Sequence, residues 1–295
     1  MDEHDGLAAQ FEQNRTHLRA VAYRMLGSVS EADDAVQESW LRLSRADPSE
    51  IGNLGGWLTT VVARVCLDML RSRKSRREEP LDVFVPDPIV SRDDGVDPES
   101  EALQVDSVGL AMLVVLETLA PAERLAFVLH DMFGVSFDEV AVIVGRSPAA
   151  TRQLASRARR RVQGAPAPDT DLNRQRRVVD AFLAASRGGD FEALLAVLDP
   201  DVVLRAEAGA APAGSGPAVS KLVRGAKAVV EQALTFAKLA PRTQPAIVNG
   251  AAGVVTVVRG QVFAVMGATI RNDKITEIYI LADPVRVNRL NLTFN

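Results

Sequence analysis

The sequence predicts a multidomain protein with an all-α first half and an α+β second half. In the first half, apolar residues recur at helical spacing, and one stretch has the pattern of a helix–turn–helix. In the second half, alternating runs separated by turn dipeptides follow two helices. The Pro/Ala-rich stretch 164–170, GAPAPDT, separates the halves. A length of 295 residues is enough for two or three such domains.

The composition is that of a globular protein without special chemistry. Hydrophobic residues make up 47% of the chain, yet no apolar run is long enough for a membrane span. A single cysteine, Cys66, excludes an internal disulfide and fits a reducing cytoplasm. With only three histidines beside it, a metal site is not expected. We expect a cytoplasmic protein with no membrane contact, no cofactor and no metal.

Residues 7–77 are predicted to form the first helical domain. Its first helix ends at Gly27, and Ser30 caps a second helix with the sequence EADDAVQESWLRL. One face of this second helix is acidic and polar, and it carries Asp33, Asp34, Gln37 and Glu38. Both a docking surface for a basic partner and a solvated helix face have this composition.

A third helix, Trp57–Arg77, follows a predicted loop at Ile51–Gly56. Its first half is apolar, and Trp57 is expected to lie in the core. Its second half is basic, because Arg64–Arg77 holds six basic residues against one acid, Asp68. A surface of this charge suits the phosphates of nucleic acid.

Residues 78–106 change character. They hold ten acids, one arginine and four prolines. A stretch of this composition buries too little apolar surface to offset its ordering entropy. The sequence therefore predicts an acidic, flexible linker.

A second helical domain is predicted at 107–163, and it ends in a helix–turn–helix. Ser136 and Glu139 form a capping box, Gly145 ends that helix, and Ser147 caps the next. Six arginines and no acid occur in the stretch 146–163. A one-sign face suits the major groove of DNA, whereas a solvated helix normally mixes signs. The residues predicted to face outward are Ala149, Arg152, Gln153, Ser156, Arg157 and Arg160.

The two helical domains resemble the extracytoplasmic-function sigma factors of bacterial RNA polymerase. The segments SEADDAVQESWLRL and GWLTTVVARVCLDMLRSRKSRRE resemble their region 2. The segment LETLAPAERLAFVLHDMFGVSFDEVAVIVGRSPAATRQLASRARRRV resembles their region 4. The resemblance implies two partners. One is core RNA polymerase, bound at its clamp helices and flap, and the other is promoter DNA.

The resemblance also implies roles for individual residues. The acidic face formed by Asp33, Asp34, Gln37 and Glu38 matches the part that docks on the clamp helices. The six outward residues of the helix–turn–helix would read the −35 element. An unpaired base and the phosphates of the −10 element would be bound by polar and basic residues of region 2, namely Asn53, Arg64, Arg71, Arg73, Lys74, Arg76 and Arg77.

After a linker at 164–173, residues 174–295 are predicted to form an α+β domain. Two helices precede a strand at Val202–Glu207, a helix covers Gly225–Leu239, and four more strands follow. This order, with FEALLAVLDPDVVLRAEAG and ITEIYILADPVRVNRL, resembles the cone-shaped SnoaL-like domains found on some of these sigma factors. Two motifs depart from that family. Its Asp-Gly-Gly-Gly run is Glu207-Ala208-Gly209-Ala210 here, and its Trp-Leu-Pro linker motif is Phe84-Val85-Pro86.

The resemblance implies an unidentified small apolar ligand inside the cone. Catalysis there would need a buried acid or base facing the pocket. No histidine follows His130, and of Asp201, Glu207 and Asp283 only Glu207 lies within a predicted strand. We therefore expect no enzyme, but a sigma factor modulated by its own C-terminal domain. The alternative is a one-component helix–turn–helix regulator that senses a small ligand in the C-terminal cone.

Overall fold

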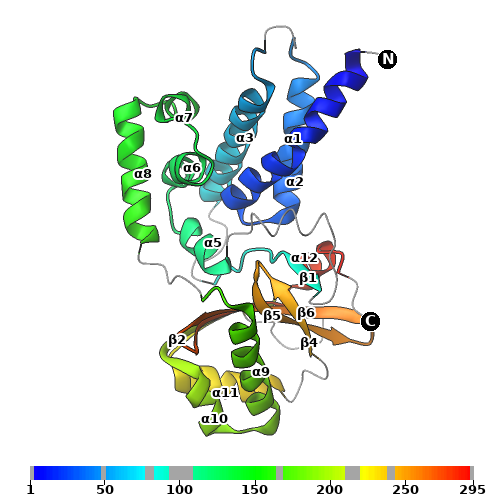
Figure 1. Cartoon of the computed structure of the whole chain (residues 1–295), viewed down its shortest axis with the longest axis vertical. Coiled ribbons are helices and arrows are strands. Elements are labelled where there is room, and N and C mark those ends of the chain that lie inside the picture. The colour runs from blue at the N-terminus through cyan, green and yellow to red at the C-terminus, as the bar shows by residue number, and fades with distance from the viewer. Residues whose placement is uncertain are drawn as a thin grey trace. The chain divides into compact units, whose positions relative to one another are not determined.

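The computed structural model describes residues 3–47, 51–76, 83–92, 109–163, 169–209, 220–237 and 243–292. The chain forms two compact units, each assembled from two separate stretches of sequence, and Figure 1 labels their elements. The helical unit comprises Met1–Glu79 and Val115–Ala165, and the sheet unit comprises Pro80–Val114 and Pro166–Asn295. The two helical stretches therefore pack as one body, and the stretch after Pro80 packs with the C-terminal domain.

The helical unit begins with three helices that bury a common apolar face. Leu18, Met25 and Leu58 are fully buried between them. The C-terminal half of the unit adds four short helices. No described helix, here or in the sheet unit, is long and apolar enough to cross a membrane. The helices of this unit are α1 (Glu3–Leu26), α2 (Val29–Leu43), α3 (Leu54–Arg76), α6 (Pro121–Phe127), η2 (Val128–Met132), α7 (Phe137–Val144) and α8 (Pro148–Val162).

Two helix starts differ from the sequence-based prediction. Ser28, not Ser30, caps α2, because the Ser28 hydroxyl accepts a hydrogen bond from the Glu31 N–H. Helix α3 starts at Leu54, so the predicted loop is shorter than expected. The Asn53 side chain accepts a hydrogen bond from the Gly56 N–H at 3.1 Å and so satisfies a first-turn donor.

Side chains from α6 and from the end of η2 contact the first helix, α1. Arg124 is only 2% exposed, and its guanidinium donates a hydrogen bond to the Met25 carbonyl at 2.8 Å. This bond satisfies a carbonyl in the last turn of α1, where no intrahelical donor remains. The Phe133 ring lies edge-on to His17 and 4.8 Å from the Arg24 guanidinium. These contacts explain why two domains that are separate in sequence form one body.

The helix–turn–helix has the predicted local structure. Both bonds of the Ser136–Glu139 capping box are present, and Gly145 ends α7 with φ of 71°. The Ser147 hydroxyl accepts a hydrogen bond from the Ala150 N–H at the start of α8. The inward face of α8 buries Thr151, Leu154, Ala155 and Ala158.

The sheet unit is built on one seven-stranded sheet with the order β1-β4-β5-β6-β7-β2-β3. All neighbours are antiparallel except β2 and β7. The predicted strands fall on β2 and β4 to β7, whereas β1 and β3 were not predicted. At the hairpin turns, Asn249, Arg259 and Asn272 have φ near 50°, as the turn dipeptides require. The strands are β1 (Val90–Arg92), β2 (Leu198–Glu207), β3 (Lys221–Arg224), β4 (Thr243–Val248), β5 (Ala251–Val258), β6 (Gln261–Arg271) and β7 (Lys274–Leu281).

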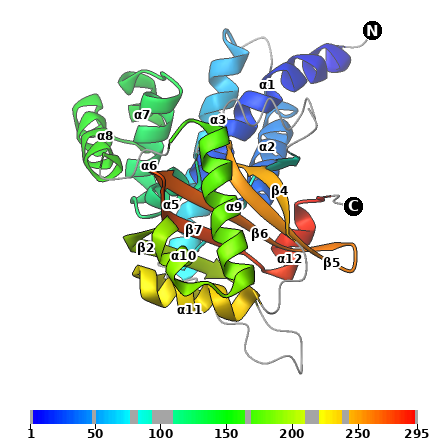
Figure 2. The ribbon, with the colours of Figure 1, turned by 60° about the horizontal axis from the view of Figure 1, so that its bottom comes forward.

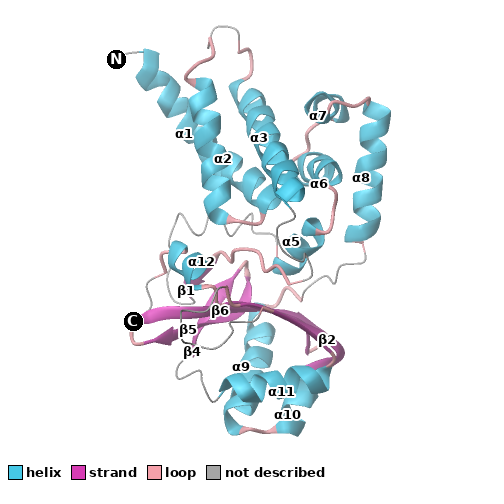
Figure 3. Cartoon of the chain, turned by 180° about the vertical axis from the view of Figure 1, so that it is seen from behind, coloured by secondary structure: helices cyan, strands magenta, loops and turns pink. Residues whose placement is uncertain are grey.

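Three helices cover one face of this sheet. They are α9 (Leu172–Gly188), α10 (Phe191–Val197) and α11 (Ala226–Ala237), and Figure 2 and Figure 3 show them on the same side of the strands. The core between helices and sheet includes Phe182, Leu194, Val229 and Ile278, and its described members are all apolar. The last helix, α12 (Pro284–Arg289), lies on the other side of the strands in Figure 3.

The prediction of an unstructured linker is wrong for residues 83–92. This segment buries Val85 and Val90, and its strand β1 pairs with the edge strand β4. The start of helix α5 (Leu110–Glu117) packs against the same sheet. The contact is close: a Cβ atom added to Gly267 of β6 would stand only 2.7 Å from the Leu110 side chain. The average composition of the stretch is acidic, which hides its apolar residues. Composition also cannot show that the edge of β4 is open for pairing with this segment. The rest of the predicted linker, 78–82 and 93–106, lies outside the described residues.

Candidate nucleic-acid interface and linker clamp

The recognition face predicted on α8 is exposed. All six residues predicted to face outward are exposed in the structure. Arg157 also has an intramolecular partner, because its Nε donates to the Glu123 carboxylate at 2.7 Å. Glu123 also accepts from Arg161 at 3.0 Å, and its side chain is only 8% exposed. Arg157 therefore anchors α8 to α6, whereas Arg152 contacts only the Phe137 ring in the described structure, at 5.5 Å.

An open pocket of about 560 Å³ lies beside the first turns of α3. It brings together two predicted residues, Asn53 and Arg64, both exposed. Trp57 was expected in the core, but it is half-buried and lines this pocket instead. Apolar spacing identifies one face of α3 but does not show how much of that face its neighbours cover. The full lining is Arg42, Asn53, Gly56, Trp57, Thr60, Val61, Arg64 and Glu139.

The chemistry of this pocket fits an unpaired nucleotide. An aromatic ring offers a stacking surface, and guanidinium and amide groups offer hydrogen-bond donors to base edges and phosphates. Arg42 and Glu139 were not predicted from the sequence. Arg42 comes from α2 and Glu139 from α7, so only the tertiary structure places them here.

The basic end of α3 divides into two kinds of residue. Arg71 is exposed and lies 3.6 Å from Asp68. Arg73 forms an ion pair with Glu31 and donates to the Leu26 carbonyl at 3.1 Å. In this structure Arg73 thus stabilises the end of α1 and is not free for phosphate binding. The side chains of Lys74 and Arg76, and the whole of Arg77, lie outside the described residues.

The acidic face of α2 is accessible. Asp33, Asp34 and Gln37 are exposed, and Leu41 beside them is 40% exposed. Asp33 pairs with Arg19 at 2.6 Å, and Glu38 pairs with Arg42 at 2.8 Å. Both pairs are exposed to water and therefore weak. A basic partner can thus replace Arg19 or Arg42 beside these carboxylates.

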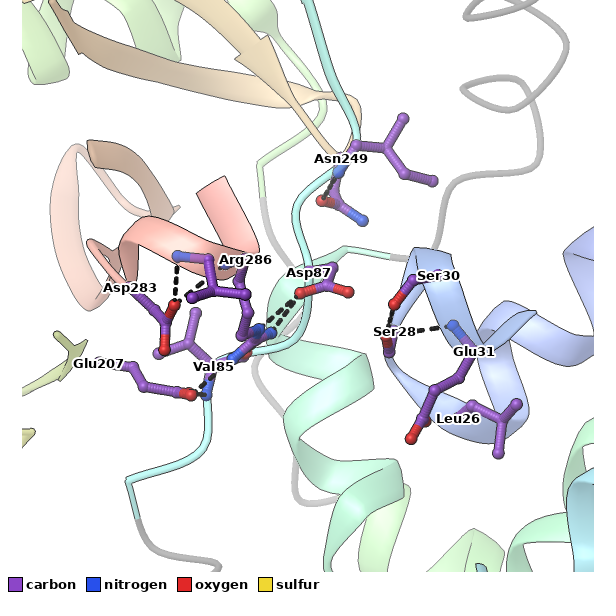
Figure 4. A network of polar contacts seen from close by, with 12 residues as sticks. Leu26, Ser28, Ser30, Glu31, Val85, Asp87, Glu207, Asn249, Asp283 and Arg286 are labelled. Atoms are coloured by element: carbon purple, nitrogen blue, oxygen red, sulfur yellow. Dashed lines mark hydrogen bonds and ion pairs between the residues drawn. The ribbon is translucent and has the colours of Figure 1, made fainter. Parts of the chain in front are cut away.

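A second polar site holds the linker to the sheet unit, and we call it the linker clamp (Figure 4). Its centre is Arg286 of α12, which bonds both linker and sheet. The guanidinium donates to the Asp87 carboxylate at 2.8 Å, the Val85 carbonyl at 2.7 Å and the Glu207 carboxylate at 2.6 Å. Glu207 also accepts from the Val85 N–H at 2.9 Å. Asp283 caps α12 and so fixes the helix that carries Arg286.

The clamp is largely withdrawn from water. The side chains of Arg286, Asp87 and Glu207 are 17%, 7% and 12% exposed. Burial lowers the pKa of Arg286, but the two carboxylates outweigh burial and raise that pKa above its ordinary value. The guanidinium is therefore always charged. The departures from the SnoaL-like motifs fall here, since Glu207 starts one altered run and Val85 lies within the other.

The acids considered for catalysis have structural positions. Glu207 belongs to the clamp, Asp283 caps α12, and Asp201 is exposed in the first half of β2, where its N–H donates to the Asp199 carboxylate. Glu277 of β7 was not considered from the sequence although it also lies in a strand, and it accepts a hydrogen bond from the Tyr279 hydroxyl. Burial, followed by the nearby Glu277 charge, raises the pKa of Tyr279. Among the described residues, no group of three or more His, Cys, Asp or Glu side chains could hold a metal ion.

Comparison with protein families defines the class of the helical unit. The sequence matches Sigma-70 region 2 over residues 10–76 and Sigma-70, region 4 over residues 110–162. The two matches cover the pocket beside α3 and the exposed face of α8. They define a DNA-binding protein of the sigma-70 class.

Relatives extend over both units. The ECF RNA polymerase sigma factor SigJ of Mycobacterium tuberculosis (strain ATCC 25618 / H37Rv) is 38% identical over 293 residues, which cover 94% of this chain and 91% of the relative. The "Probable ECF RNA polymerase sigma factor SigI" of Mycobacterium tuberculosis (strain CDC 1551 / Oshkosh) is 35% identical and covers 98% of both chains. The crystal structure of Mycobacterium tuberculosis SigJ aligns with a TM-score of 0.75 and 36% identity, over 95% of this chain and 98% of that one.

The chain therefore belongs to the ECF RNA polymerase sigma factors, and it directs transcription initiation with RNA polymerase. The fold class predicted from the sequence, two helical sigma regions followed by a cone-like α+β domain, is confirmed. The alternative of a one-component regulator is not favoured.

Proposed function

We propose that the pocket beside α3 binds an unpaired base of the −10 element, and that the outward face of α8 reads the −35 element. The observation that carries the first assignment is the meeting of Trp57, Asn53 and Arg64 in one open pocket within region 2. Proteins commonly hold a flipped base by stacking it on a ring and by hydrogen bonds to its edge. The exposed α8 face, rich in arginine, supports the second assignment. The acidic face of α2 is proposed to dock on the clamp helices of core polymerase.

Run-off transcription tests the −10 assignment. The wild-type protein with core polymerase first selects promoters from a random DNA library, and the selected promoter serves as template. Trp57→Ala and Arg64→Ala should lower transcript yield and leave affinity for core polymerase unchanged. Arg15→Ala is the matched control, since Arg15 is an exposed cation on α1 outside the pocket. Equal yields from all four proteins would remove the pocket from promoter recognition.

We further propose that the C-terminal domain controls this activity by holding the segment between regions 2 and 4. Residues 83–92 are bound to the sheet through β1 and the clamp. The nine residues from Arg76 to Val85 span at most about 30 Å. With the clamp closed, only this short stretch connects region 2 to the segment that the sheet holds. Binding two promoter elements on polymerase requires regions 2 and 4 to separate, so opening the clamp would shift the balance between the two states.

Transcription by truncated proteins tests this control. Deletion of residues 171–295 removes the sheet, and deletion of the tail after Asp283 removes Arg286 with α12. Both should change transcript yield at equal concentrations of folded protein. Three equal yields would show that the domain is a passenger. A small ligand is not part of this proposal.

A further inference from the structure

We propose that Arg42 is a further nucleic-acid-binding residue of the region 2 pocket, and that its ion pair with Glu38 couples this pocket to the polymerase-docking face. The inference rests on the proposed function of both surfaces. It adds a residue from α2 to a pocket otherwise built from the start of α3. It also connects the pocket beside α3 physically with the acidic face of α2, two surfaces that the sequence predicts separately.

The position of Arg42 supports a role in binding. Arg42 lines the pocket together with Arg64 and Trp57. Its Nε pairs with the Glu38 carboxylate at 2.8 Å, and both side chains are 42% exposed. Within the described residues, no hydrogen bond holds the two Nη groups of Arg42. These donors are thus available to a base edge or a phosphate without breaking the fold.

The charges of the pocket favour an anionic occupant. Arg42 and Arg64 bring two permanent positive charges to one open pocket. In the free chain Glu38 offsets the charge of Arg42, and the Glu139 carboxylate lies in the same lining. A nucleotide brings phosphate charge and base acceptors, and can take the place of Glu38, while Glu139 keeps its capping-box bonds to Ser136.

The Glu38 pair gives the coupling. Glu38 belongs to the acidic face of α2 with Asp34 and Gln37, and Arg42 lies one turn further along the same helix. A basic surface of polymerase that attracts the Glu38 carboxylate leaves Arg42 without its neutralising partner. An exposed pair of this kind contributes little, so the exchange is easy. Polymerase docking then strengthens DNA binding in the pocket, and by linkage DNA strengthens docking to the same extent.

Affinity for a fork-junction DNA tests the inference. The DNA carries the −10 sequence selected by the wild-type holoenzyme as a single strand, and binding is measured at saturating core polymerase. Arg42→Ala should weaken binding about fivefold or more, as expected for the loss of one specific contact. Arg45→Ala, which removes an exposed cation just after α2 and outside the pocket, should leave binding unchanged. Circular dichroism should be the same for both variants.

The Glu38→Gln variant tests the coupling. Saturating fork DNA should raise the affinity of the wild-type protein for core polymerase, and this gain should be smaller in Glu38→Gln, because the carboxylate that Arg42 and polymerase share is absent. If Glu38→Gln shows the full wild-type gain, the coupling through Glu38 is wrong. If Arg42→Ala matches Arg45→Ala, or weakens only polymerase binding, the nucleic-acid role of Arg42 is wrong. Failure of the proposed −10 function looks different, because Trp57→Ala would then also bind the fork normally.

Discussion

Replacement of Arg286 by Met should release the linker segment from the sheet unit. Methionine keeps an apolar stem of similar length but removes every donor of the clamp. The carboxylates of Asp87 and Glu207, 7% and 12% exposed, would then lie close together without a cation. Breaking a buried pair by removing one partner costs about 3–5 kcal/mol. The linker can escape this cost by undocking, because β1 pairs with β4 through only three residues.

The expected effect is local, and amide hydrogen exchange measures it. The N–H groups of Val85 and Ile89 are held by the Glu207 carboxylate and the Asn249 side chain. A cost of about 3–5 kcal/mol corresponds to an open population larger by about two to four orders of magnitude. Exchange at these two amides should therefore accelerate by about a hundredfold or more in Arg286→Met. Amides of the β5–β6 ladder should exchange at the wild-type rate.

Arg289→Met is the matched control, since Arg289 is exposed on the same helix and makes no contact in the clamp. It should leave all of these rates unchanged. Wild-type exchange of the Val85 amide in Arg286→Met would refute the reasoning, because docking would then not depend on the guanidinium. Faster exchange throughout the sheet would also refute it, because Arg286 would then hold the domain together and not the linker.

Four further outcomes are expected. Asp34→Lys combined with Glu38→Lys should abolish binding to core polymerase with unchanged circular dichroism, and undiminished co-purification with polymerase would contradict the docking assignment. Arg152→Ala should cost about 1–3 kcal/mol of binding concentrated at one promoter position. Arg157→Ala should lower the free energy of unfolding. The loss should be no more than about 1 kcal/mol, because the ion pair of Arg157 with Glu123 of α6 is half open to water. An unchanged thermal midpoint would refute that effect. Burial raises the pKa of the Cys66 thiol, so a thiol reagent at neutral pH should label it only as fast as the helical unit opens, and rapid labelling of native protein would contradict this.

The parts of the fold that the sequence predicts are those with local causes. The capping box at Ser136, the positive φ of Gly145 and the Ser147 cap each depend on residues a few positions apart. The turn dipeptides that separate β4 to β7 are equally local. The clamp has no such signal, because Asp87 and Arg286 are 199 residues apart. The acidic composition around Asp87 predicted a flexible linker, whereas the structure shows this segment bound to the sheet unit.

The candidate site shows the same division. Asn53 and Arg64 could be proposed from their place in region 2, and the exposed face of α8 follows from helical spacing. The burial of Trp57 could not be predicted, because helical spacing identifies an apolar face but not where a neighbouring helix stops covering it. Arg42 was missed for a related reason. Its sequence neighbours Trp40, Leu41 and Leu43 are apolar, and only the packing of α2 against α3 brings it to the pocket.

Strand β1 has a consequence for the C-terminal domain as an evolutionary and engineering module. The domain cannot be excised at the 164–170 boundary as a self-contained cassette, because one strand of its sheet is encoded before region 4. A fragment cut there would expose the edge of β4, with backbone donors and acceptors open to pairing with other chains. During synthesis, β1 leaves the ribosome about 150 residues before its partner strand and must wait for it. Transfer of this domain to another sigma factor therefore requires transfer of two separate segments, with the right length of chain between them.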